Sequence, residues 1–133
     1  MSPDDIKIKY WFDIASYDLD TAKALLKTQR FLYVGFMCHQ AIEKALKGYF
    51  TFVLNDAPPY THNLTLLAEK SGIDKILSET HKNLMDKLAP LNIEARYPTF
   101  KEILFKTLSY ETCELLIKQT EELYQWISQQ LLK

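Results

Sequence analysis

The sequence predicts an all-α fold: an antiparallel up-and-down bundle of about five helices, three long and two short. Apolar residues recur at spacings of three and four over long segments, which is the periodicity of amphipathic helices. The prolines fall between these segments, at positions 3, 58, 59, 90 and 98. Alternating β-branched runs bounded by glycine turns, the pattern of strands, are missing from the sequence. Residues 1–133 are therefore expected to form a single helical domain.

The first two long helices are expected at residues 3–28 and 31–54. Ser2 can cap the first of them, Pro3 suits the first helical position, and the two acidic residues that follow complement the helix dipole. The segment 31–54 is apolar around most of its circumference, so we expect it to be the central helix.

Two shorter helices and a third long one complete the predicted bundle. Thr61 can cap a short helix that ends at Gly72, and a further helix is expected over residues 73–88. The last helix is expected over residues 109–131, where the apolar stripe includes Cys113. Cys38 and Cys113 lie within apolar helical patterns, so both are predicted to be small core residues and not a disulfide.

Composition and charge exclude several classes of function. The chain has 16 Lys and Arg against 17 Asp and Glu, which excludes the broad basic surface of a non-specific nucleic-acid binder. No apolar run approaches the roughly 20 residues of a membrane span, and the N-terminus lacks the pattern of a signal peptide, so a cytoplasmic location is expected. The histidines and cysteines lack metal-ligand spacing, and neither a metal nor another cofactor is predicted.

A polar stripe interrupts the otherwise apolar central helix. On a helical wheel, Gln40, Glu43, Lys44 and Lys47 share an arc of roughly 100°, with His39 at its edge. The arc could be a solvated face in which Glu43 and Lys47 form an ion pair worth about 0.2–0.5 kcal/mol. It could also be a polar groove or a self-complementary dimer face, where the two lysines meet phosphate and Gln40 meets a base edge or a backbone group. The wheel leaves both interpretations open.

Four segments carry a resemblance to a known family. The stretch Phe36–Lys47 resembles the second-helix signature of the HEPN domains, the higher eukaryotes and prokaryotes nucleotide-binding family. Residues 11–33 resemble the family's first helix and the link that follows it. Residues 61–64 resemble a His-x-Leu element, and residues 95–98 match an Arg-Tyr-Pro element of the stand-alone prokaryotic branch. The match covers most of the chain, with all four segments in register.

The resemblance implies a helical homodimer and a partner protein, a minimal nucleotidyltransferase, in a pair similar to a toxin–antitoxin system. It also implies a site for nucleotide or RNA, in which Arg96 joins the lysines in a phosphate-binding patch and Tyr97 stacks on a base. Alternatively, Arg96 pairs structurally with Glu43 or Asp18. The residues expected to bind nucleotide or RNA are His39, Gln40, Glu43, Lys44, Lys47, Arg96 and Tyr97.

The sequence departs from the ribonuclease members of the family in one respect. Their signature is an Arg with a His four to six positions further on, whereas residues 97–104 contain no His. Arg96 stays protonated and cannot act as a base, so a protein with weak or no catalytic activity is the first hypothesis. The alternatives are a metal-independent ribonuclease toxin that pairs Arg96 with a displaced His such as His39, and a structural dimeric scaffold. His62 is expected to fix the loop into the third helix, and His81 to lie on an exposed helix surface.

Overall fold

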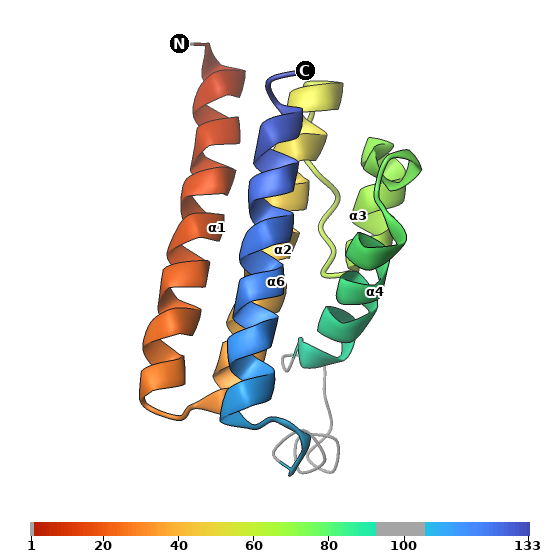
Figure 1. The fold of residues 1–133 in the computed structure, drawn as a ribbon. Coiled ribbons are helices and arrows are strands. Elements are labelled where there is room, and N and C mark those ends of the chain that lie inside the picture. Colours follow the sequence, from red (N-terminus) through yellow and green to blue (C-terminus); the bar gives the residue numbers. More distant parts are fainter. Residues whose placement is uncertain (1, 93–105) are drawn as a thin grey trace.

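The computed structural model describes residues 2–92 and 106–133, and within them every regular element is helical (Figure 1). The all-α prediction is therefore confirmed. The described helices are α1 (Pro3–Lys27), α2 (Phe31–Leu54), α3 (Leu64–Ser71), α4 (Glu79–Leu88) and α6 (Tyr110–Gln130), with short 3₁₀ helices η1 (Ile73–Lys75) and η2 (Ala89–Leu91).

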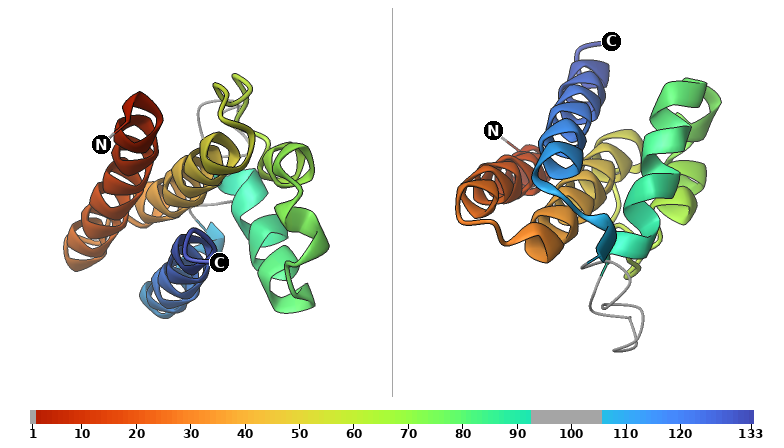
Figure 2. Two further views of the ribbon diagram at one scale, coloured as in Figure 1. Left: turned by 90° about the horizontal axis from the view of Figure 1, so that it is seen from above. Right: turned by 60° about the horizontal axis from the view of Figure 1, so that its bottom comes forward.

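The central helix is α2, which contacts every other described α-helix. Seen from above in Figure 2, it lies between α1 and the pair formed by α3 and α4, and α6 packs across one side. The rings of Phe31 and Tyr110 are 6.5 Å apart, which places the starts of α2 and α6 together. The rings of Phe12 and Tyr124 are 6.1 Å apart. Helices α2 and α6 therefore run in the same direction, and α1 runs opposite to both.

The long helices begin and end close to their predicted limits. The Ser2 side chain accepts a hydrogen bond from the backbone of Asp5, and the Asp5 side chain accepts one in return, so a capping box starts α1. The bounds of α2 are those expected from the apolar pattern. Ser109 caps α6 by accepting a hydrogen bond from the backbone N–H of Thr112.

The short helices differ from the prediction at their starts. Asn63, not Thr61, caps α3, because its Oδ1 accepts the hydrogen bond of Leu66 N at 3.0 Å. The helix expected over 73–88 is divided into η1 and α4, because Ser78 caps a new helix at Glu79. The expected surface position of His81 is also wrong: it is partly buried, and its ring centroid lies 4.6 Å from that of Trp126.

Both cysteines are buried free thiols, as predicted. Burial raises the pKa of the Cys38 thiol to about 12 and that of the Cys113 thiol to about 11, so both stay protonated at neutral pH. They act as small core residues. Among the described residues, no helix has both the length and the apolar composition needed to cross a membrane.

The contact between α1 and α2 depends on Gly48. A Cβ at this position would lie 2.6 Å from Cε2 of Phe12 and 3.0 Å from Cβ of Trp11. We expect Gly48→Ala to lower the free energy of unfolding by about 1–3 kcal/mol, because the two helices must move apart. The matched control is Gly35→Ala, whose Cβ would meet the flexible end of the Leu91 side chain at 3.1 Å. Urea unfolding of both variants measures the difference; equal losses would contradict this account of the packing.

Candidate functional site

The polar stripe of α2 lies on the side of the helix away from α6. Cys38 faces α6, where the Thr120 side chain is close enough to act on the pKa of its thiol. Gln40 is about 160° from Cys38 around the helix. Glu43 is 1% exposed, Lys47 is 7% exposed and Gln40 is 9% exposed. The solvated-face interpretation of the stripe is therefore wrong: these polar groups are buried.

Glu43 is the centre of the buried cluster. Its Oε2 lies 3.1 Å from Nζ of Lys47, and its Oε1 lies 2.8 Å from Nδ1 of His62. The Lys47 ammonium also stands 5.7 Å from the centroid of the Trp11 ring, within the range of a cation–π contact. Lys47 and Glu43 therefore neutralise one another inside the protein, where an unpaired charge would be strongly unfavourable.

His62 joins the cluster from the connection between α2 and α3. It is 19 positions from Glu43 in the chain, and their hydrogen bond ties this connection to α2. The imidazole remains partly accessible, with 43% of the side chain exposed. His62 was expected to fix the loop into the third helix, and it does so by its hydrogen bond to Glu43. The sequence signal for His62 was its His-x-Leu element, but no pattern linked it to Glu43.

Lys44 and Gln40 form a second pair, on the more open part of the stripe. Nζ of Lys44 donates to Oε1 of Gln40 at 2.7 Å. The Lys44 side chain is 20% exposed, compared with 9% for that of Lys47. Within the described residues, Nε2 of Gln40 is buried without a hydrogen-bond acceptor. This pair therefore combines a buried amide N–H that lacks an acceptor with a lysine whose side chain is partly exposed.

Asp18 of α1 lies close enough to Lys44 and Glu43 for their charges to act on it, and from the sequence it was one alternative structural partner of Arg96. It is 8% exposed, and its Oδ2 has no hydrogen-bond donor among the described residues. Burial raises the pKa of the Asp18 carboxyl, an effect that nearby Lys44 opposes and Glu43 reinforces. Asp18 thus adds an acceptor to the cluster that nothing in the sequence pattern had placed there.

His39 lies at the edge of the stripe that faces the protein core, and it is buried. It is 1% exposed, and burial lowers its pKa to about 4, although Glu43 acts in the opposite direction. The ring is therefore neutral at pH 7. A group this inaccessible is poorly suited to act as a base on a bound substrate.

Arg96 and Tyr97 lie outside the described residues. The described chain stops before them at Asn92, which is 5% exposed and has a buried Oδ1 without a hydrogen-bond partner among the described residues. Asn92 and His62 line the same pocket of about 280 Å³ at the start of α3. The polar cluster of α2 is therefore continuous, through His62, with a polar cavity beside the end of the described segment.

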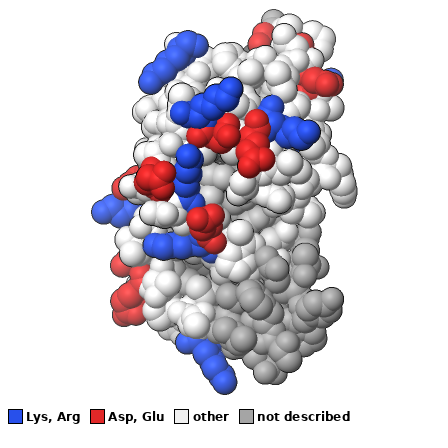
Figure 3. Space-filling model, turned by 90° about the vertical axis from the view of Figure 1, so that its right-hand side faces the viewer, with Lys and Arg blue, Asp and Glu red and all other residues white. Residues whose placement is uncertain are grey.

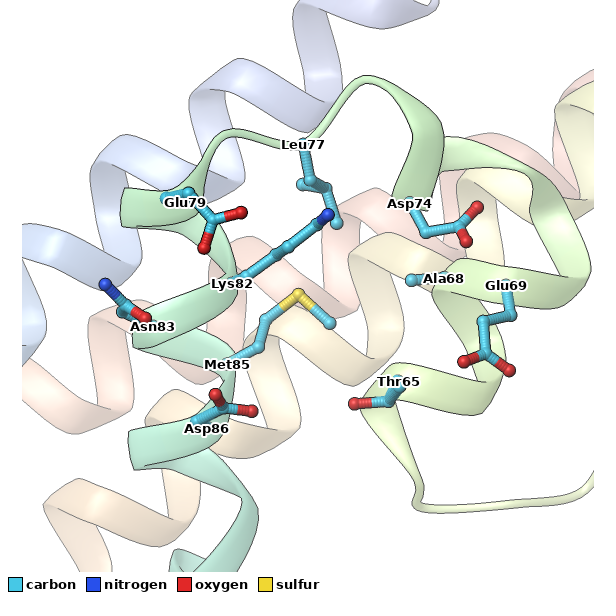
Figure 4. Close-up of a pocket in the computed structure, with 10 residues that line it drawn as sticks. All are labelled: Thr65, Ala68, Glu69, Asp74, Leu77, Glu79, Lys82, Asn83, Met85 and Asp86. Carbon is cyan, nitrogen blue, oxygen red and sulfur yellow. The ribbon is translucent and has the colours of Figure 1, made fainter.

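A second pocket, of about 340 Å³, separates α3 from α4 (Figure 4). Met85 points into it from α4, and Lys82 reaches along its edge. Four carboxylate residues surround this single lysine: Glu69, Asp74, Glu79 and Asp86. Figure 3 shows this side of the molecule, where basic and acidic side chains are interspersed. The excess of carboxylates makes this pocket unfavourable for a phosphate group.

Comparison with known proteins agrees with the resemblance in the sequence. The model of the HEPN domain matches residues 8–131. A crystal structure of an archaeal HEPN homologue is 16% identical in sequence and covers 93% of this chain and 97% of its own, with a TM-score of 0.66. At this identity the likeness shows a shared fold. No curated protein matches the chain in sequence. Because the family model spans nearly the whole sequence, the chain belongs to the HEPN domain family.

Proposed function

We propose that this HEPN protein binds nucleotide or RNA through Gln40, Lys44 and the segment with Arg96 and Tyr97. We further propose that it acts as the partner of a minimal nucleotidyltransferase in a pair similar to a toxin–antitoxin system. The observation that carries the binding proposal is the Lys44–Gln40 pair, which combines a partly exposed lysine with a buried amide donor that lacks an acceptor among the described residues. Phosphate oxygens and base edges accept hydrogen bonds from such groups.

The remaining residues of the predicted site have supporting roles in this proposal. Lys47 is committed to Glu43, and His39 is enclosed, so neither is expected to contact a ligand directly. Asp18, whose pKa is affected by the charges of Lys44 and Glu43, supplies a buried acceptor without a donor among the described residues. A group that both donates and accepts, such as the edge of a base, suits this combination better than phosphate alone.

Binding of a fluorescent ATP analogue and of short single-stranded RNA tests the proposal. We expect Lys44→Ala and Arg96→Ala each to weaken binding about tenfold or more, because each removes a charge-assisted hydrogen bond. For RNA, each variant is expected to reduce the salt dependence by about 0.7 in logarithmic slope for each phosphate that it no longer binds. Lys82→Ala, which changes the lysine of the acidic pocket, is the control and leaves binding unchanged. Equal binding by wild type and Lys44→Ala would reject the site.

The partner is tested by expressing the chain together with the product of the neighbouring gene, which the proposal expects to be a minimal nucleotidyltransferase. We expect the two proteins to purify as a complex, and Arg96→Ala to weaken that complex. Recovery of this chain without the neighbouring protein, under conditions where both are expressed and folded, would contradict the proposed partnership.

A second candidate function is metal-independent RNA cleavage, for which the geometry favours His62 over His39 as the base. Glu43 lies 2.8 Å from Nδ1 of His62 and thereby fixes the orientation of the ring, as a carboxylate does beside a catalytic imidazole. The His62 side chain is 43% exposed, so substrate can approach it. If the protein cleaves RNA, His62→Gln is expected to abolish cleavage and His81→Gln to retain it. Absence of cleavage by wild type, with and without its partner, removes this candidate.

A further inference from the structure

The acidic pocket between α3 and α4 has no part in the proposed function. It lies between two walls, with α4 on one side and α3 with η1 on the other (Figure 4). Its volume of about 340 Å³ is within the range of ligand-binding pockets. The apolar part of its lining comes from Ala68, Leu77 and Met85, which are 2%, 8% and 4% exposed. The pocket therefore offers a surface for methylene groups beneath a polar rim.

The charges of the acidic pocket are unbalanced. Glu79 and Asp86 belong to α4, whereas Glu69 belongs to α3 and Asp74 to η1, so carboxylates stand on both walls (Figure 4). Within the described residues, none of the four forms an ion pair with Lys82 or with another basic side chain. Four carboxylates and one lysine leave an excess of three negative charges around the pocket. A ligand of opposite charge is therefore favoured there.

Asp74 carries an acceptor that has no donor. Its Oδ1 is buried and forms no hydrogen bond within the described part of the chain. Figure 4 shows its side chain on the wall opposite Lys82. A buried carboxylate oxygen without a donor is unfavourable, because the hydrogen bonds to water that it loses on folding are not replaced. A cation that enters the pocket stabilises such a carboxylate.

The carboxylates are spread along the pocket and not gathered around one point. Glu79 and Asp86 are two turns of α4 apart, which is about 10 Å along the helix axis. Among the described residues, no group of three or more His, Cys, Asp or Glu side chains is arranged to hold a metal ion. An extended cation with several charges therefore matches the pocket better than a single compact ion.

We propose that the acidic pocket binds a linear polyamine, a chain of methylene groups interrupted by ammonium groups, such as the triamine spermidine. Its methylene groups lie against Met85 and Leu77, and its ammonium groups pair with the carboxylates of both walls. Three ammonium groups balance the three excess negative charges, whereas the lysine side chain of another protein balances only one. The site shares no residue with the polar stripe of α2, so it stands or falls independently of nucleotide binding.

Isothermal titration calorimetry of the full chain with spermidine at low ionic strength tests the proposal, and we expect one saturable site per chain. Hexaamminecobalt(III) carries the same charge in a compact shape without methylene groups. It is expected to bind at least about tenfold more weakly, since burial of two methylene groups already accounts for that factor. The amide of Nα-acetyl-lysine, with one ammonium group, is also expected to bind at least about tenfold more weakly. Equal affinity for spermidine and either compound would overturn the proposal.

Two substitutions one turn apart on α4 are expected to change the affinity for spermidine in opposite directions. Asp86→Asn removes an attractive charge and weakens binding about fivefold, whereas Lys82→Gln removes a competing cation and strengthens binding about threefold. Both side chains are exposed, so both variants are expected to fold, and circular dichroism verifies this. Asp13→Asn, at an exposed carboxylate of α1, is the control and leaves the affinity unchanged. The absence of saturable binding by wild type, or changes of the same sign in the two α4 variants, would reject the site.

Discussion

Replacement of Glu43 by Gln is expected to lower the free energy of unfolding by about 3–5 kcal/mol, the cost of leaving one member of a buried ion pair without its partner. The Lys47 ammonium has 9% of its side chain exposed and lies 3.1 Å from Glu43, so water cannot readily replace the missing carboxylate. The same change weakens the hold on His62, since its Nδ1 bonds to Glu43 Oε1. Urea unfolding followed by circular dichroism measures the loss.

Two matched variants identify the cause of that loss. Asp13→Asn breaks the exposed Lys9–Asp13 pair and is expected to change stability by at most about 0.5 kcal/mol. Glu43→Leu combined with Lys47→Met removes both charges, and we expect the double variant to be more stable than Glu43→Gln. A loss of less than about 1 kcal/mol for Glu43→Gln would show that Lys47 is not held as a buried charge.

Acidification is expected to destabilise the fold through His39. Burial lowers the pKa of His39 from 6.5 to about 4, so the unfolded chain binds the proton first as pH falls. The contribution of His39 to the free energy of unfolding is therefore complete above pH 6.5, and it is lost as the pH falls towards 4. The shift corresponds to about 3 kcal/mol. The charged or titratable groups that act on the ring are Glu43, His62 and Lys44.

Comparison of wild type with His39→Gln isolates this contribution. The variant is less stable at neutral pH, but its free energy of unfolding is expected to fall less steeply between pH 6.5 and 4. Asp18 acts with the opposite sign, because burial raises the pKa of its carboxyl and stabilises the protonated form. Asp18 is present in both proteins, so its pH-dependent contribution cancels when the two pH profiles are compared. Parallel pH profiles for the two proteins would contradict the buried, neutral state of His39.

The long helices could be predicted from the sequence because their signals are local and agree with one another. Pro3 and Ser2 mark the start of α1, and the apolar pattern marks both ends of α2. The starts of the short helices could not be predicted to the residue. Thr61 and Asn63 are both good caps, and the backbone geometry decides between them. Similarly, Ser78 competes with the continuation of a helix from Ile73.

The arc of polar residues on α2 could also be found from the sequence, but its burial could not. A wheel gives the direction of Glu43 and Lys47 and says nothing of what covers them. The hydrogen bond between Glu43 and His62 spans 19 positions, and Asp18 comes from a different helix. Such long-range partners depend on the packing of α1 and of the α2–α3 connection against α2. They divide the stripe into the structural Glu43–Lys47 pair and the more accessible Lys44–Gln40 pair.

The most direct test of this division is an NMR titration of the isotope-labelled protein with ATP and with short single-stranded RNA. The quantity measured is the change in chemical shift of each backbone amide. The account predicts that the largest shifts occur in α2 around Gln40 and Lys44 and in the connection around His62, and that Lys44→Ala suppresses them. Shifts centred on the acidic pocket around Lys82, or no shift with either ligand, would contradict the assignment of the α2 stripe as the ligand site.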